Sequence, residues 1–114
     1  MLILGVDPGT IITGFGIVKY ENNKLSYIHS GIITTPKIKE IPPRLELIYS
    51  ELDNIINIYN PSQFAIETAF YNKNVQSVLK IGYVRGIALL LAQQHKLEIS
   101  EYSPREIKKS VVGN

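Results

Sequence analysis

The sequence predicts an α/β fold in which helices flank a five-stranded mixed β-sheet. Three strand-like segments joined by short polar turns open the chain, and helix-like and strand-like segments then alternate to its end. The 114 residues are enough for one compact domain and too few for two, so we assign residues 1–114 to a single domain. Its 45 % hydrophobic and 19 % charged residues are typical of a globular protein.

The first three predicted strands lie close together in the sequence. Leu2 to Val6 is a short run of branched apolar residues, typical of a buried strand, and the turn residues from Asp7 to Thr10 end it. Phe15 to Tyr20 is the second predicted strand, and Leu25 to Ile33 is the third, after a polar turn over residues 21–24. Because the connections are short, we expect an antiparallel meander.

A helix and a fourth strand follow. Pro42 and Pro43 end the extended structure and open a helix, which Asn60-Pro61 terminates. One face of this helix carries apolar residues at helical spacing: Leu45, Ile48, Leu52, Ile55, Ile56 and Tyr59. Phe64 to Glu67 is the fourth strand, and because a helix leads into it, we expect it to run parallel to the first.

The last third of the chain continues the alternation. A second helix is expected from about Lys73 to His95, with apolar residues Val75, Val78, Leu79, Val84, Ile87, Leu90 and Leu91. Glu98 to Tyr102 is the fifth predicted strand. Ser103 to Glu106 has the form of a capping box with proline at the first helical position, so a third helix is expected to start there. Since the chain ends soon afterwards, we expect it to be truncated.

Composition narrows the range of functions. The chain has no cysteine, which excludes disulfides and thiolate metal sites. The net charge of +2 is compatible with a nucleic-acid partner but does not argue for one. We see no signal peptide and no apolar run approaching the roughly 18 residues of a membrane helix. We therefore expect a soluble, cytoplasmic protein with no membrane partner.

Two carboxylates stand out by their position. Asp7 follows the first apolar strand, and Glu67 closes the fourth. If these strands are neighbours, both acids lie at one end of the sheet, where ligands of such sheets gather. Two acids placed there repel each other unless a cation neutralises them, and oxygen ligands of this kind suit Mg²⁺ or Mn²⁺. The alternative for each residue alone is ordinary: aspartate is common in turns, and glutamate at a strand end is commonly solvated.

Four motifs in order resemble the RuvC family of Holliday-junction resolvases, which have a ribonuclease-H-like fold. The first is Gly5-Val-Asp-Pro-Gly-Thr10, continuing through Thr13-Gly-Phe-Gly16, and the second is Phe64-Ala-Ile-Glu67 with the Phe70 and Lys73-Asn74 that follow. The others are Leu79-Lys80-x-Gly82-x-x-Arg85-Gly86 and Lys108-x-x-Val111-Val112-Gly113. The resemblance covers essentially the whole chain.

The resemblance implies a metal-dependent endonuclease that cleaves four-way junction DNA. It makes Asp7 and Glu67 catalytic ligands of Mg²⁺, with Mn²⁺ as a substitute, and a pair of such ions can activate water and stabilise the leaving oxygen. The family has two further acidic ligands on a helix beyond the position of Asn114. On this basis we expect the C-terminal helices to be missing and the chain as given to be inactive.

The resemblance also implies DNA contacts. The aromatic at the Phe70 position is thought to stack on a nucleotide of the opened junction, and a lysine at the Lys108 position serves DNA binding. By motif or proximity, the phosphate-contact candidates are Lys73, Lys80, Arg85, Arg105, Lys108 and Lys109, and for Lys80 we favour simple solvation. The alternatives are that Phe70 packs under its own loop and that the lysines are merely solvated.

Association is a further implication. Gly82 and Gly86 lie four residues apart on the second helix, which forms the dimer interface in the family, so a homodimer is expected. Close packing against the domain's own sheet is the alternative for both glycines. The family also implies the branch-migration proteins RuvA and RuvB as partners.

Two other functions remain open from the sequence. A sugar-kinase or actin-like ATP-binding domain opens with a similar hairpin, and its Asp-x-Gly-Thr turn matches residues 7–10, although the other motifs do not fit. A non-catalytic junction-binding relative would share the fold without cleaving DNA.

Overall fold

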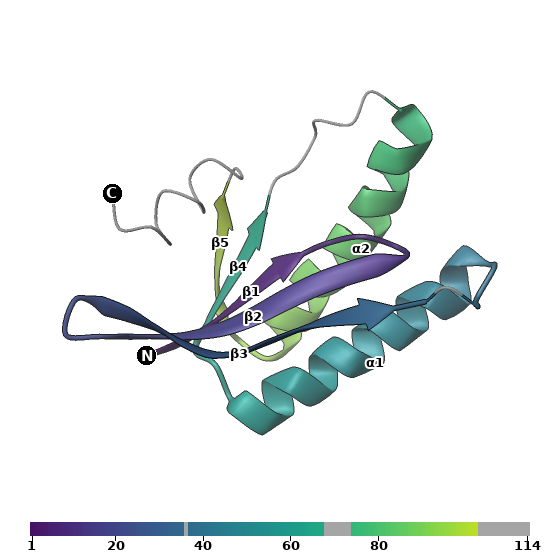
Figure 1. Cartoon of the computed structure of the whole chain (residues 1–114). Helices are drawn as coiled ribbons and strands as arrows, with labels where there is room; N and C mark the ends of the chain where they lie inside the picture. The colour runs from purple at the N-terminus through teal and green to yellow at the C-terminus, as the bar shows by residue number, and fades with distance from the viewer. Residues whose placement is uncertain (36, 68–73, 103–114) are drawn as a thin grey trace.

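The computed structural model describes residues 1–35, 37–67 and 74–102, which form one sheet and two helices (Figure 1). In chain order, the elements are β1 (Leu2–Asp7), β2 (Ile12–Glu21), β3 (Lys24–Thr34), α1 (Ile41–Tyr59), β4 (Gln63–Glu67), α2 (Val75–Gln94) and β5 (Glu98–Tyr102).

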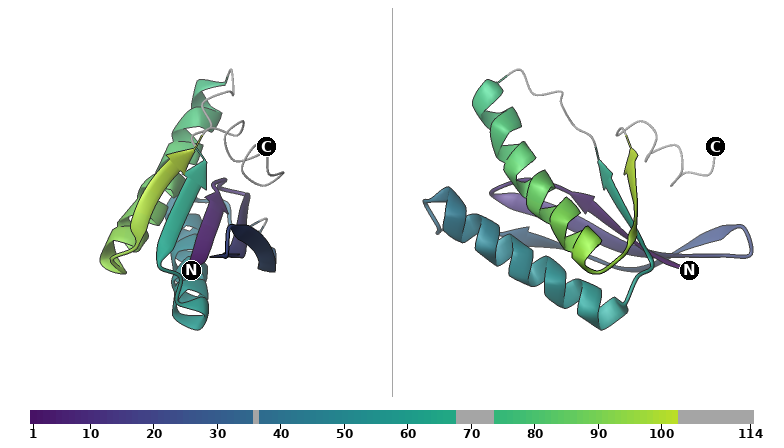
Figure 2. Two further views of the ribbon diagram at one scale, coloured as in Figure 1. Left: turned by 90° about the vertical axis from the view of Figure 1, so that its left-hand side faces the viewer. Right: turned by 180° about the vertical axis from the view of Figure 1, so that it is seen from behind.

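The five strands form a single mixed sheet in the order β3-β2-β1-β4-β5. The β1–β2 and β2–β3 pairs are antiparallel, whereas β4 pairs with β1 and β5 pairs with β4 in parallel. Both the antiparallel meander and the parallel fourth strand are therefore confirmed. Both helices lie on one face of the sheet, which leaves the other face uncovered by the described helices (Figures 1 and 2).

The core lies between the helices and this face of the sheet. Leu4, Ile17 and Phe64 from three adjacent strands are at most 1 % exposed. They pack with the buried residues of α1, which are Ile48, Leu52, Ile55 and Ile56, and with those of α2, which are Val84, Ala88, Leu91 and Ala92. Side chains alternate along a strand, so the residues between the core positions point to the opposite, non-core face.

The ends of α1 follow from its sequence. Proline occupies the first turn, where a missing N–H costs nothing, and Asn60 ends the helix in the left-handed conformation with φ of 49°. The backbone N–H of Asn60 donates to the carbonyl of Ile56 at 2.7 Å. The predicted apolar face is confirmed, because four of its six residues are fully buried and the other two are partly buried against the core.

The helix α2 begins two residues later than expected because Asn74 caps it. The Asn74 side chain accepts a hydrogen bond from the backbone N–H of Gln76 at 2.9 Å. The expectation that no segment has the length and hydropathy of a membrane span is wrong, since this 20-residue helix reaches a mean hydropathy of 1.4. We nevertheless assign it to the domain, because Val84 and Leu91 pack in the core and Arg85 forms an ion pair with Glu101 on β5.

Side-chain pairs join the layers. His95 at the end of α2 contacts Asp53 of α1, with 2.6 Å between Nε2 and Oδ1. The Arg85–Glu101 ion pair joins α2 to the last strand, so the guanidinium of Arg85 holds two elements together. A phosphate contact of Arg85 stays a prediction.

Two other expectations have different outcomes. The strand β2 runs from Ile12 to Glu21 and is longer than the predicted Phe15–Tyr20, because Ile12, Thr13 and Gly14 at its start and Glu21 at its end also pair with β3. The expected helix after Ser103 lies outside the described residues.

Candidate metal centre

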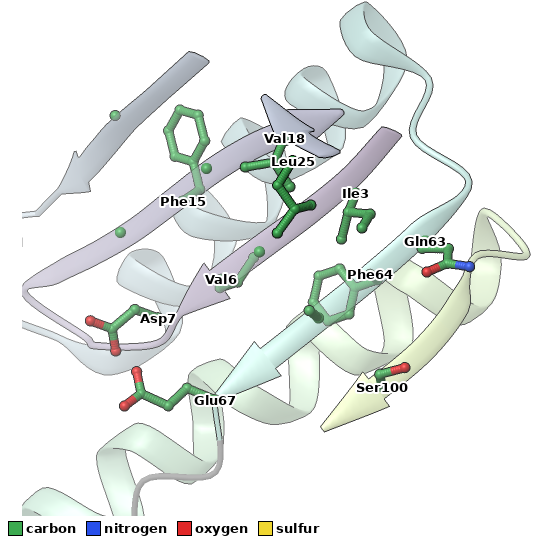
Figure 3. Close-up of a pocket in the computed structure, with 15 residues that line it drawn as sticks. Ile3, Val6, Asp7, Phe15, Val18, Leu25, Gln63, Phe64, Glu67 and Ser100 are labelled. Atoms are coloured by element: carbon green, nitrogen blue, oxygen red, sulfur yellow. The ribbon is translucent and has the colours of Figure 1, made fainter. Parts of the chain in front are cut away.

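Pairing between β1 and β4 brings Asp7 and Glu67 together. Val6 and Ile66 are directly opposite each other in the parallel ladder, and the two acids are the next residue of each strand. Because Val6 and Ile66 are core residues, the acids point to the non-core face. Their carboxyl groups face one another across the ends of the two strands (Figure 3). The expected placement at one end of the sheet is therefore observed.

The two acids are electrostatically linked. The pKa of the Glu67 carboxyl is raised above its ordinary value near 4.5, first because the side chain is partly withdrawn from water. The negative charge of Asp7 raises it further, and a hydrogen bond from one carboxyl group to the other adds to the effect. Ionising both carboxyl groups at once costs electrostatic free energy, because their negative charges repel each other. A bound cation would offset this cost.

The turn after Asp7 is fixed by two buried threonines. Thr13 is 0 % exposed, and its Oγ1 donates to the carbonyl of Gly9 at 2.5 Å and accepts from the Gly9 N–H at 3.2 Å. Thr35 is 1 % exposed, and its Oγ1 donates to the carbonyl of Thr10 at 2.5 Å while its N–H donates to Ile11 at 3.0 Å. These bonds hold the β1–β2 turn, and with it the strand end that carries Asp7.

Gly9 is required inside this turn for a steric reason. A Cβ built on it would lie 2.2 Å from the carbonyl oxygen of Ile12, which is too close for any side chain. Gly9 and Thr13 belong to a motif recognised in the sequence, whereas Thr35 does not. No local pattern around Thr35 indicates its role, because the carbonyl to which it donates lies 25 residues earlier in the chain.

Small residues form a row beside the acids on the non-core face. Gly16, Gly5, Ala65 and Ser100 lie directly opposite one another on β2, β1, β4 and β5. They line an open depression of about 450 Å³, whose walls are mostly apolar and whose rim includes Asp7 and Glu67 (Figure 3). The arrangement places two carboxylates at the edge of a shallow surface that can accept a bulky ligand.

The carboxylate pair is the extent of the acidic cluster in the part of the chain that the structure describes. No group of three or more histidine, cysteine or acidic residues close enough to hold one metal ion occurs there. Since Mg²⁺ takes six oxygen ligands, two carboxylates fit as part of its coordination shell and leave positions for water and substrate. The other predicted site residues, Phe70, Lys73, Arg105, Lys108 and Lys109, lie outside the described residues.

Comparison with known proteins decides the family. A family model described as crossover junction endodeoxyribonuclease RuvC matches residues 3–114. The chain belongs to the RuvC family. The RuvC protein of Alkaliphilus oremlandii is 50 % identical over 113 residues, which are 99 % of this chain and 69 % of that protein. For the RuvC protein of Halothermothrix orenii the identity is 44 %, over 99 % of this chain and 68 % of the relative.

Solved structures agree on the fold of this RuvC-family chain. Thermus thermophilus RuvC, in complex with a Holliday-junction substrate, has a TM-score of 0.88 at 23 % identity, covering 100 % of this chain and 70 % of that one. The fowlpox virus Holliday-junction resolvase has a TM-score of 0.60 at 17 % identity, covering 91 % and 62 %. The predicted ribonuclease-H-like fold class is confirmed. Nucleases of the RuvC family are metal-dependent in general.

We predict that Thr35→Val lowers the free energy of unfolding by about 1–3 kcal/mol. Valine has nearly the same shape but leaves the buried Thr10 carbonyl without its donor. The matched control is Thr34→Val, because Thr34 is the exposed residue directly before Thr35, at the end of β3. Urea unfolding of both variants measures the difference, and equal losses would show that the Thr35 hydroxyl does not hold the turn.

We also predict a pH dependence from the raised pKa of Glu67. The Glu67 carboxyl binds its proton more tightly in the folded state than in the unfolded state. Its contribution to the free energy of unfolding is therefore complete below the pKa of the unfolded state, and it is lost as pH rises through the pKa of the folded state. Without divalent cations, wild type should therefore lose stability relative to Glu67→Gln as pH rises from about 4 to about 7. Glu51→Gln, at an exposed position on α1, is the control. Parallel pH profiles for wild type and Glu67→Gln would contradict the linkage.

Proposed function

We propose that this protein is an endodeoxyribonuclease that resolves Holliday junctions in DNA recombination and repair. The convergence of Asp7 and Glu67 at the ends of two adjacent parallel strands, in a chain that matches the RuvC family model from residue 3 to 114, carries the proposal. The close relatives are named crossover junction endodeoxyribonucleases, and the Thermus thermophilus relative is in complex with a Holliday-junction substrate.

We propose Mg²⁺ as the cofactor, with Mn²⁺ as a possible substitute, and Asp7 and Glu67 as its catalytic ligands. When bound in pairs, such ions activate water and stabilise the leaving oxygen of a phosphodiester. The carboxylates hold the positive charge at the rim of the depression, and the threonine-braced turn keeps Asp7 in place while a strand binds. The remaining ligands would come from water, phosphate oxygens and groups outside the described residues.

DNA contacts are proposed for the segments that follow β4 and β5. Phe70 and Lys73 come soon after Glu67 in the sequence, and Arg105, Lys108 and Lys109 come soon after Tyr102. The last residues of the two strands, Glu67 and Tyr102, are paired in the ladder, so both strands end at the edge of the sheet that carries the carboxylate pair. An aromatic residue there can stack on an unpaired base, and cations can neutralise phosphates.

The exposed face of α2 is the proposed homodimer interface. Four apolar residues along it, Val75, Leu79, Tyr83 and Leu90, are between 47 % and 72 % exposed. Gly82 and Gly86 are also exposed, and a Cβ added to either meets nothing within 4 Å. The alternative that these glycines pack against the domain's own sheet is therefore wrong. A two-fold dimer would present two acidic sites to the two-fold symmetric junction.

The cellular setting follows from the same proposal. A junction resolvase acts on chromosomal DNA, so we propose the cytoplasm as its location and RuvA and RuvB as its partners. An ATP-binding domain is less well supported, because the family match runs through both acidic motifs and to the end of the chain.

We predict that Asp7→Asn and Glu67→Gln, in the protein at its natural full length, each reduce junction cleavage at least about 100-fold. Losing several kcal/mol of metal-based stabilisation of the transition state has that effect, since 1.36 kcal/mol corresponds to about tenfold. Single-turnover cleavage of a labelled four-way junction in Mg²⁺ measures it, with Glu51→Gln as the control. Undiminished cleavage by either variant would overturn the proposed roles.

We predict that Gly86→Leu weakens dimerisation at least about tenfold without destabilising the monomer. Leucine replaces a helical glycine over open space, so the monomer gains helix propensity, while a partner helix can no longer approach closely. Ser50→Leu, at an exposed position on α1, is the control. Sedimentation equilibrium gives the dimer constant, and unchanged association of Gly86→Leu would place the interface elsewhere.

A further inference from the structure

Buried polar side chains gather at the β1–β2 turn. In the part of the chain that the structure describes, the buried residues with polar side chains are Thr10, Thr13 and Thr35, which are 7 %, 0 % and 1 % exposed. The hydroxyl groups of Thr13 and Thr35 both donate to carbonyl oxygens of this turn. Burying a hydroxyl group costs free energy unless it is hydrogen-bonded, and valine fills nearly the same space. Hydrogen bonding, and not packing alone, is therefore what these positions provide.

The turn matters for Asp7 because the sheet holds this residue on one side only. Asp7 pairs with Gly14 on β2. On its other side, the ladder between β1 and β4 ends one residue earlier, at Val6 and Ile66. Gly14 has no side chain to support the exposed carboxyl group, and a Cβ built on it would lie 3.7 Å from the Asp7 Cβ. Freedom in the turn that follows Asp7 would thus become freedom of the carboxyl group.

A series of hydrogen bonds ties this turn to α1. Thr35 donates through its hydroxyl to the Thr10 carbonyl at 2.5 Å and through its N–H to the Ile11 carbonyl at 3.0 Å. The Thr35 carbonyl accepts from the Ile38 N–H at 3.2 Å, and the Ile38 carbonyl accepts from the Arg44 Nε at 2.6 Å. The β1–β2 turn and the start of α1 lie at the same end of the sheet (Figures 1 and 2).

Arg44 is a firm starting point for this series. It lies four residues before Ile48 and eight before Leu52, so it shares the face of α1 that these two buried residues turn toward the sheet. Its side chain is partly buried, and a hydrogen bond from a charged donor is stronger than one between neutral groups. The rigidity of the packed helix is therefore passed to Ile38 and on to Thr35.

We propose that Thr35 and Arg44 are positioning residues of the metal centre, which act through the β1–β2 turn to set the affinity of Asp7 and Glu67 for a divalent cation. They supply no ligand themselves. A ligand that is already ordered loses less conformational freedom when the cation binds, so the cation binds more tightly. The inference rests on the proposed nuclease function and adds to it the residues that prepare its carboxylates.

The role of the Thr35 hydroxyl is tested by Mn²⁺ binding to the protein at its natural full length. The EPR signal of free Mn²⁺ gives the dissociation constant without any cleavage. Thr35→Val keeps the shape and removes the donor, and it should weaken Mn²⁺ binding about tenfold, because binding must then also order the turn. Thr35→Ser keeps the donor and should stay within about twofold of wild type. Equal losses in both variants, or none in Thr35→Val, overturn the inference.

A matched variant separates positioning from a general loss of stability. Leu91 of α2 is 1 % exposed, and Leu91→Val shortens a buried side chain in the core without touching the turn. Urea unfolding should show lower stability for both Leu91→Val and Thr35→Val. Only Thr35→Val should lose Mn²⁺ affinity. A comparable loss of affinity in Leu91→Val would show that any loosening of the fold has this effect, and the inference would fail.

The role of Arg44 is tested by the sign of the change. Arg44→Met removes a positive charge, so Coulomb attraction alone predicts Mn²⁺ binding that is unchanged or tighter. The positioning role predicts the opposite, a weakening of about threefold, because the Ile38 carbonyl loses its donor. The control is Lys39→Met, which removes an exposed charge next to Ile38 and should not weaken binding. Unchanged or tighter binding by Arg44→Met, or equal weakening by Lys39→Met, overturns the role of Arg44.

A double variant tests the order of the series. If Arg44 acts through Thr35, then Thr35→Val already breaks the connection to the turn. Thr35→Val/Arg44→Met should therefore bind Mn²⁺ within about twofold of Thr35→Val alone. Losses that multiply in the double variant would show that Arg44 acts by another route and would remove it from the inference.

The Mn²⁺ dependence of cleavage gives a further readout. In Thr35→Val, half-maximal cleavage of a labelled four-way junction should need about ten times more Mn²⁺, while the maximal rate falls less than about threefold, because a bound cation itself holds Asp7 in place. A maximal rate that falls at an unchanged Mn²⁺ requirement contradicts a role in preparing the metal centre.

Failure of this inference is distinguishable from failure of the nuclease function. If Asp7→Asn abolishes Mn²⁺ binding and cleavage while Thr35→Val and Arg44→Met match wild type, only the positioning inference is wrong. If Asp7→Asn binds Mn²⁺ and cleaves like wild type, the nuclease proposal and this inference both fail. Should Thr35→Val not fold, the comparison of Arg44→Met with Lys39→Met decides: a loss in the first alone supports the inference, and equal affinities overturn it.

Discussion

The parallel pairing of β1 with β4 is the constraint on which the candidate site depends. Asp7 and Glu67 are sixty residues apart in the sequence, and the pairing of their two strands makes them neighbours. Helix α1 is what allows it, because a parallel connection has to cross from one end of the sheet to the other. The buried face of α1 packs against the sheet and so fixes the crossover connection. This connection in turn sets the position of Glu67 relative to Asp7.

The remaining parts of the site stabilise this arrangement at its edges. Thr13 and Thr35 hold the turn beyond Asp7 through buried hydrogen bonds, and Gly9 leaves room for the Ile12 carbonyl. On the non-core face, which also carries the acids, the row of small residues leaves an open depression beside them. A rigid turn and an open face suit a site that binds a large substrate across a fixed pair of charges.

Much of this architecture could be predicted from sequence because its signals are local. Branched apolar runs marked β1 and β4, proline and asparagine marked the ends of α1, and Glu98–Tyr102 was placed to the residue. The full length of β2 was not predictable, because glycines paired within a ladder look like loop residues in a sequence. The outward apolar face of α2 and its hydropathy were missed since the helix is apolar on both sides. The role of Thr35 could not be found because it depends on a contact between the segment after β3 and the β1–β2 turn, which the sequence does not encode locally.

The central claim is that Asp7 and Glu67 share a divalent cation, and crystals soaked in Mn²⁺ test it most directly. The account predicts an anomalous difference peak between the two carboxyl groups, about 2.0–2.3 Å from an oxygen of each, and its loss in Glu67→Gln crystals. Full Mn²⁺ occupancy at a different position, with the two carboxyl groups still bonded to one another, would contradict it.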